Sequence, residues 1–202
     1  MKRRLKFGLA MLVLAAPLVA AAPVRAALPV LLPKPGQVGF ALQGQYGTML
    51  SSGNLGSDFG SGGGLTVRVR YRMRYERALG ISFESQSLDA RAAATSDTSR
   101  TQLNVLLSGL DFYQMFNTDQ KLQQMLSIGA GLAQLHYTLR DGETEYPLAG
   151  DGVYVTVGAG IERFFYRSLA FDISGRYIAI FEDGKPNHDF QGAAGLIFYA
   201  SY

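Results

Sequence analysis

Cysteine and tryptophan are both absent from the 202 residues of the chain. The lack of cysteine excludes disulfides, thiolate metal sites and catalysis by a cysteine nucleophile. Histidine is scarce, with two residues, so few side chains could act as a catalytic base of the usual kind. After residue 26 no uninterrupted apolar run is long enough for a helix to span a bilayer. A membrane-embedded form of this part would therefore have to be a closed barrel of strands.

Residues 1–26 have the pattern of a secretory signal peptide. A cluster of basic residues precedes an apolar stretch, and Val24 and Ala26 supply the small side chains expected before a cleavage site. Pro17 and Pro23 interrupt the apolar stretch before it reaches the length of about 20 residues that a spanning helix needs. We therefore predict a cleaved signal peptide rather than a membrane anchor.

The net positive charge of the chain comes from this leader. The formal net charge of +3 and the pI of about 9.2 could suggest a nucleic-acid ligand. The leader carries five basic residues and no acidic residue, so without it the net charge falls to −2. The sequence therefore gives no support for nucleic-acid binding.

Beyond residue 36 the hydrophobic pattern has a period of two, which is typical of strands. The clearest example is 65–75, where apolar residues alternate with threonine and arginine. The eight runs are 37–50, 65–75, 81–88, 102–116, 125–139, 153–164, 169–181 and 190–202. In the fourth run apolar residues occupy both parities, so its inward face and its register stay open; a bulge near Gly109 would account for this.

The connections between these runs alternate in length. Long polar connections cover 51–64, 89–101, 140–152 and 182–189, and shorter ones cover 76–80, 117–124 and 165–168. Long outer loops, short periplasmic turns and tilted strands of about 9–11 membrane residues are typical of outer-membrane barrels. We predict an all-β fold: an eight-stranded antiparallel up-and-down transmembrane β-barrel over residues 37–202, after a periplasmic N-terminal segment over 27–36. A soluble secreted β-sandwich is the alternative.

The arginines of the second run decide which face meets lipid. On the lipid side each would cost about 2–4 kcal/mol near the midplane, so the barrel requires them inside, paired with acids. A solvated arginine stripe on a soluble sandwich is the competing interpretation. We expect the hairpin that turns around residues 76–79 to place Glu84 opposite Arg70 or Arg72. The predicted lumen ion-pair network comprises Arg68, Arg70, Arg72, Arg74, Glu84, Asp111, Glu162, Asp172 and Arg176.

Ten aromatic residues fall near the two ends of the predicted barrel, as in the girdles of membrane barrels. At the short-turn end they are Tyr75, Tyr113, Phe116, Phe164, Phe165, Tyr166 and Tyr202. At the long-loop end they are Tyr46, Phe181 and Phe190.

Four segments carry a resemblance to a known family: LSIGAGLAQLHY (126–137), VYVTVGAGIERFF (153–165), LAFDISGRYIAIF (169–181) and GLIFYASY (195–202). With them, residues 37–202 resemble the small OmpA-like outer-membrane β-barrels, the outer membrane protein beta-barrel domain group. The resemblance implies residence in the outer membrane, contact with its lipid and lipopolysaccharide, and delivery by the barrel-insertion machinery. It also implies that Phe198 and Tyr202 form the insertion signal, although the family most often ends on Phe.

We expect no enzymatic activity, no cofactor, no metal site and a monomer. His136 has no serine close by on its face, unlike the motif of lipid A deacylases, and His188 falls in a predicted outer loop. The function we favour is a structural or surface-interaction role with a lumen closed by Arg–carboxylate pairs. A narrow ion-conducting channel is the alternative, ahead of a lipid-modifying barrel enzyme. Acidic residues of one outer loop, Asp141, Glu143 and Glu145, could bind lipopolysaccharide phosphates through divalent cations, or could simply be solvated.

Overall fold

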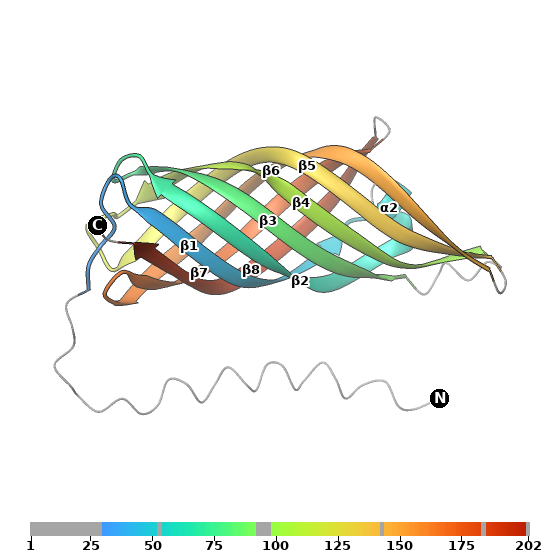
Figure 1. Ribbon diagram of the computed structural model, residues 1–202, viewed down its shortest axis with the longest axis horizontal. Coiled ribbons are helices and arrows are strands. Elements are labelled where there is room, and N and C mark those ends of the chain that lie inside the picture. The colour runs from blue at the N-terminus through green and yellow to red at the C-terminus, as the bar shows by residue number, and fades with distance from the viewer. Residues whose placement is uncertain (1–29, 52–53, 92–97, 142–143, 183–184, 201–202) are drawn as a thin grey trace, which may run out of the picture.

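The fold is a closed barrel of eight antiparallel strands, in which each strand pairs with its neighbours in sequence and β1 closes the barrel on β8 (Figure 1). The computed structural model describes residues 30–51, 54–91, 98–141, 144–182 and 185–200, so the predicted leader lies outside it. The strands are β1 (Val38–Met49), β2 (Phe59–Arg72), β3 (Arg77–Ala90), β4 (Thr98–Phe116), β5 (Leu122–Asp141), β6 (Thr144–Tyr166), β7 (Leu169–Glu182) and β8 (Lys185–Ala200). A short helix, α2 (Asn54–Asp58), precedes β2. No helix among the described residues is long and apolar enough to cross a membrane.

The alternation in the sequence corresponds to the two faces of the barrel wall. On β2, Leu65 and Val67 are 61% and 47% exposed on the outside, whereas Arg68 is 2% exposed inside. The same pattern holds along the other strands, where large apolar side chains cover the outer surface. The predicted eight-stranded antiparallel barrel with an apolar exterior is therefore confirmed.

The strands extend further at the long-loop end than the sequence suggested. β5 ends at Asp141 and β6 begins at Thr144, so most of the predicted loop 140–152 belongs to a long hairpin (Figure 1). The predicted loop 182–189 likewise belongs largely to β7 and β8, and 51–64 holds α2 and the start of β2. The prediction that these three segments are long polar connections between strands was therefore wrong for most of their length. Apolar inward residues such as Phe59 and Leu135 pack inside this part of the barrel and hold its strands together.

The fourth strand has a definite inward face. Leu103, Val105 and Leu107 point inward and are buried, while Leu106 and Leu110 face outward. Apolar residues occupy both odd and even positions of this strand because one face packs in the interior and the other covers the outside of the barrel. The bulge considered near Gly109 is wrong, because pairing with β3 and β5 runs through that residue; the register shift lies between Arg100 and Leu103.

The segment before β1 lies against the short-turn end of the barrel. The Leu31 amide donates a hydrogen bond to the Arg167 carbonyl (3.0 Å), and the Gly36 amide donates one to the Arg72 carbonyl (2.7 Å). Val30 and Leu32 pack on a small apolar cluster inside this end of the barrel. Residues 30–36 are therefore part of the folded domain.

Candidate functional site: the closed lumen

Three arginines of β2 enter the lumen because they alternate with outward apolar residues on one strand. Arg68, Arg70 and Arg72 are 2%, 0% and 1% exposed. The guanidinium groups of Arg70 and Arg72 reach β6 and β7, where Glu162 and Asp172 lie on the inward face with 0% exposure.

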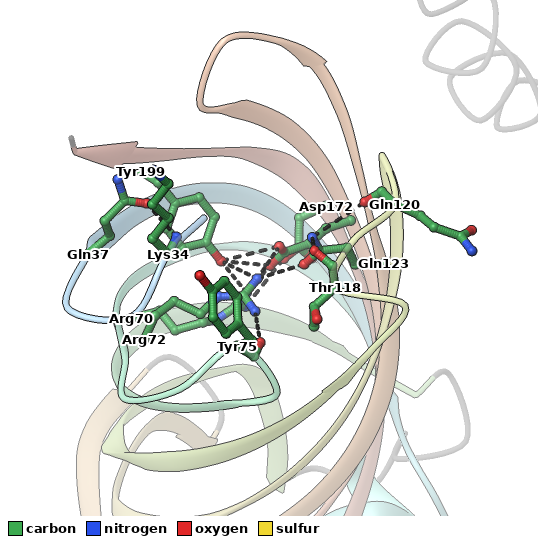
Figure 2. A network of polar contacts seen from close by, with 11 residues as sticks. Lys34, Gln37, Arg70, Arg72, Tyr75, Thr118, Gln120, Gln123, Asp172 and Tyr199 are labelled. Atoms are coloured by element: carbon green, nitrogen blue, oxygen red, sulfur yellow. Dashed lines mark hydrogen bonds and ion pairs between the residues drawn. The ribbon is translucent and has the colours of Figure 1, made fainter. Parts of the chain in front are cut away.

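Arg70 and Arg72 share carboxylates in one network (Figure 2). Arg70 forms ion pairs with Glu162 and with Asp172, the latter with 3.3 Å between Nη2 and Oδ2. Arg72 Nη2 lies 3.4 Å from Glu162 Oε2. Charges removed from water in this way are stabilised only when each has a partner and further hydrogen bonds.

Neutral side chains complete this network. The Tyr199 hydroxyl lies 3.3 Å from both Arg70 Nη1 and Arg72 Nη2, and 3.2 Å from Glu162 Oε2. Gln43 Nε2 donates to Asp172 Oδ1 (2.7 Å), and the Arg70 guanidinium lies 4.1 Å from the centre of the Tyr113 ring. The sequence prediction missed the part these side chains play in the network. Gln43 shares inward parity with Gln45, and Tyr113 shares it with Asp111, whereas Tyr199 follows the apolar Ile197.

A second group of pairs centres on Glu84. Arg68 Nη2 lies 3.8 Å from Glu84 Oε1, and Arg176 forms an ion pair with the other carboxylate oxygen. Arg176 also donates to Gln191 Oε1 (2.8 Å). Glu84 is paired with Thr66 on β2, so its predicted position opposite Arg70 or Arg72 was wrong. β2 ends at Arg72, which pairs with Ala78, and this earlier turn shifts the register.

Two other predicted members of the network differ in the structure. Arg74 is exposed in the turn between β2 and β3, so its assignment to the lumen was wrong: the strand ends before it. Asp111 is buried and accepts a hydrogen bond from the Tyr113 hydroxyl (3.2 Å), but it makes no ion pair with any described residue. With Arg74 outside, the buried lumen charges of the predicted set balance, with arginines Arg68, Arg70, Arg72 and Arg176 and acids Glu84, Asp111, Glu162 and Asp172.

Glycines on β4, β5 and β6 give the lumen side chains room. A Cβ atom on Gly158 would lie 2.6 Å from Arg176 Cγ, and one on Gly129 would lie 2.2 Å from Asp111 Oδ1. On Gly131 it would lie 2.2 Å from the Ser108 backbone oxygen and 2.5 Å from the Gly109 Cα. The two Gly-Ala-Gly triplets thus serve close packing inside a narrow barrel.

Replacing Gly131 with valine is expected to lower the free energy of unfolding by about 1–3 kcal/mol, because the neighbouring backbone has to move. Gly44→Val is the control, since a Cβ atom there meets nothing within 4 Å. Urea unfolding of both variants in detergent micelles measures the difference. An equal loss at both positions would contradict the role assigned to Gly131.

An apolar core fills the long-loop half of the lumen. Its buried members include Phe59, Leu88, Leu135 and Ile178 on four different strands, and Leu55 of α2 packs onto them. The Leu55 amide donates to Asn187 Oδ1 on β8 (2.9 Å), which fixes the helix in the mouth of the barrel. The lumen is therefore filled by a charged layer and by an apolar layer.

The other predicted residues are distributed as follows. Tyr113 and Phe164 point into the barrel and are 2% exposed, so their assignment to an outer girdle was wrong. The remaining described girdle residues, Tyr46, Tyr75, Phe116, Phe165, Tyr166, Phe181 and Phe190, are exposed. Phe198 is 50% exposed on β8, and Tyr202 lies outside the described residues.

The histidines and acidic outer residues form no site in the described part of the chain. His136 is exposed on β5, and His188 lies on β8, rather than in a loop, stacked on the Tyr177 ring with 5.6 Å between ring centres. Asp141 and Glu145 belong to the β5–β6 hairpin, and Glu143 lies outside the described residues. No group of three or more histidine, cysteine, aspartate or glutamate residues suited to a metal ion occurs among the described positions.

Comparison with known families agrees with this architecture. Residues 9–198 match the family described as outer membrane protein beta-barrel domain. The chain belongs to this family. A comparison with curated protein sequences found no match.

Solved structures of outer-membrane barrels share the fold. Neisserial surface protein A superposes with a TM-score of 0.53 at 16% identity, over 80% of this chain and 96% of that protein. For the attachment invasion locus protein of Yersinia pestis the TM-score is 0.54 at 12% identity, over 81% of this chain and 99% of that protein. For OprG from Pseudomonas aeruginosa the TM-score is 0.57 at 9% identity, over 86% of this chain and 100% of that protein. Identities this low establish the fold of this outer membrane protein beta-barrel domain, and not its activity.

Proposed function

We propose that this barrel has a structural or surface-interaction role in the outer membrane and does not conduct solutes. The proposal rests on the observation that two layers of side chains fill the lumen. Arg–carboxylate pairs occupy one part, and the apolar core capped by α2 occupies the other. An eight-stranded barrel is just wide enough for its own side chains, so this filling leaves no continuous aqueous path.

The long hairpin supports the surface part of the proposal. Beyond Val153, which pairs with Phe181, β6 continues to Thr144, and its only strand partner among the described residues is β5. Within the described part of the chain, the outer side of this stretch is therefore a sheet edge, to which another extended chain can bind. Pro147 lies within the edge stretch, a position where proline is tolerated because no ladder hydrogen bond is required.

Conductance separates this proposal from the channel alternative. In planar bilayers the purified barrel should give at most small, intermittent current, because ions would have to pass the ion-paired layer and the apolar core. Steady conductance of nanosiemens order would contradict the proposal.

Complementation of a deletion strain separates a structural role from a surface-interaction role. One strain receives the full chain, and another a chain in which residues 138–147 are replaced by an Asn-Gly turn. If the hairpin makes a surface interaction, both chains restore the permeability barrier of the envelope but only the full chain restores adhesion. Restoration of adhesion by both chains, or by neither chain, would contradict a role for the hairpin.

Further expectations about biogenesis and lipid contact belong to this proposal. The exported, cleaved chain is inserted as a monomer, with Phe198 and Tyr202 as the signal for the insertion machinery. Lipopolysaccharide contacts the outer part of the barrel, with divalent cations between its phosphates and Asp141, Glu143 and Glu145. Lipopolysaccharide binding that is unchanged by EDTA and by neutralising these acids would contradict the cation bridge.

A further inference from the structure

A cavity of about 660 Å³ lies at the short-turn end of the barrel. Its walls come from the N-terminal segment, from the turn between β2 and β3 and from the turn between β4 and β5. Figure 2 shows residues of all three segments beside the lumen network: Lys34, Tyr75 and Thr118. Its volume is within the range of small-ligand sites, about 300–1,000 Å³.

Hydrogen bonds from the lumen network fix these walls. Arg72 Nη1 donates to the Tyr75 carbonyl (3.0 Å), and Arg72 Nη2 donates to Gln123 Oε1 (2.9 Å). Gln123 Nε2 in turn donates to the Thr118 carbonyl (3.0 Å). Both turns are thus attached to the same buried arginine, and the cavity is formed before any ligand arrives.

The lining combines apolar surface with charges of both signs. Leu31 is 50% exposed and Tyr75 is 53% exposed beside the cavity. Lys34 supplies a cation, and Glu76 and Asp119 supply anions. None of these three charged side chains forms an ion pair with a residue in the described part of the chain. A ligand with both an anionic and a cationic group would therefore find partners of opposite charge in the lining of one cavity.

The position of the cavity indicates where such a ligand comes from. Tyr75 belongs to the exposed aromatic residues at the short-turn end, together with Phe116 and Tyr166. Tyrosine and phenylalanine in such a girdle lie at the level of the lipid headgroups. The cavity is therefore at the headgroup depth of the periplasmic leaflet.

We propose that this cavity binds the headgroup of a zwitterionic phospholipid that carries a primary ammonium group. Lys34 contacts the phosphate, Glu76 and Asp119 accept hydrogen bonds from the ammonium, and Leu31 contacts the apolar part of the lipid. An anionic phospholipid without an ammonium would keep the contact with Lys34 but would leave both carboxylates without a cationic partner. This inference uses the membrane location of the barrel and is independent of the proposed surface role.

Native mass spectrometry of the detergent-solubilised protein tests the proposal. The probes are phosphatidylethanolamine and phosphatidylglycerol with identical acyl chains, and soluble glycerophosphoethanolamine. We expect the wild-type protein to retain phosphatidylethanolamine preferentially. The variants Lys34→Gln and Glu76→Gln/Asp119→Asn should each weaken retention about fivefold, as expected for partly exposed charge contacts.

Matched controls keep the test specific. Lys121→Gln removes a charge at the same end without touching the cavity lining, and Asp151→Asn removes an acid at the other end; both should bind like the wild type. Gel mobility without boiling verifies that each variant is folded. Equal retention of phosphatidylglycerol, unchanged binding in the cavity variants, or equally tight binding of glycerophosphoethanolamine would overturn the proposal.

Discussion

Arg70→Gln is expected to lower the free energy of unfolding by about 3–5 kcal/mol. Arg70 is fully buried and forms ion pairs with both Glu162 and Asp172, so its loss leaves two carboxylates in the lumen with fewer cationic partners. Glutamine is too short and has no charge to replace these contacts. Urea unfolding in lipid vesicles, followed by the loss of fast gel mobility without boiling, gives the free-energy difference.

Arg74→Gln is the matched control for this prediction. Arg74 continues the alternation of Arg68, Arg70 and Arg72 in the sequence but is exposed in the turn. Its replacement should change stability by less than about 0.5 kcal/mol. A similar loss for both arginines would mean that the buried ion pairs do not stabilise this barrel.

Ile128→Arg is expected to destabilise the barrel by about 2–4 kcal/mol in a bilayer. Ile128 is 62% exposed in the middle of the outward apolar row of β5, where Leu126 and Leu132 flank it. The guanidinium would then have to enter hydrocarbon near the midplane. Unfolding in lipid vesicles measures the cost directly.

Gln134→Arg on the same strand and face is the control. Gln134 follows the apolar row towards the long-loop end, where the outer surface becomes polar, so the cost should be about 0–1 kcal/mol. Equal costs at positions 128 and 134 would contradict the assignment of the apolar face to lipid.

The sequence predicted the barrel and its inward arginines because strand alternation requires no knowledge of register. Arg68, Arg70 and Arg72 are placed by parity alone. Arg74 has the same parity, but a period of two does not mark where a strand ends, and here the turn begins first.

Register and neighbouring residues were harder to predict. The partner of Glu84 depends on the length of the β2–β3 turn, and ending β2 at Arg72 moved Glu84 opposite Thr66. Tyr113 and Phe164 were assigned to a girdle by their position near the strand ends. Each lies two residues from a predicted lumen acid, Asp111 or Glu162, so parity could have placed both inside.

The extent of the outer half could not be read from polarity. The segment 140–152 is polar because the hairpin extends beyond the apolar outer surface, and polar sequence alone does not distinguish such a hairpin from a loop. The apolar core could not be predicted from the sequence either. Leu103 and Leu107 share their strand with the outward-facing Leu106 and Leu110, and alternation does not say which of the two apolar faces packs inside.

The central claim, that the outward apolar face lies in a bilayer, is tested most directly by spin labels along β5. The chain has no native cysteine, so single cysteines can be placed at the outward positions 124, 126, 128, 130, 132 and 134 without background. In lipid vesicles we predict that accessibility to oxygen relative to a water-soluble nickel chelate is highest at positions 128 and 130 and falls towards 124 and 134. Uniformly high accessibility to the nickel chelate would contradict the account and favour a soluble barrel.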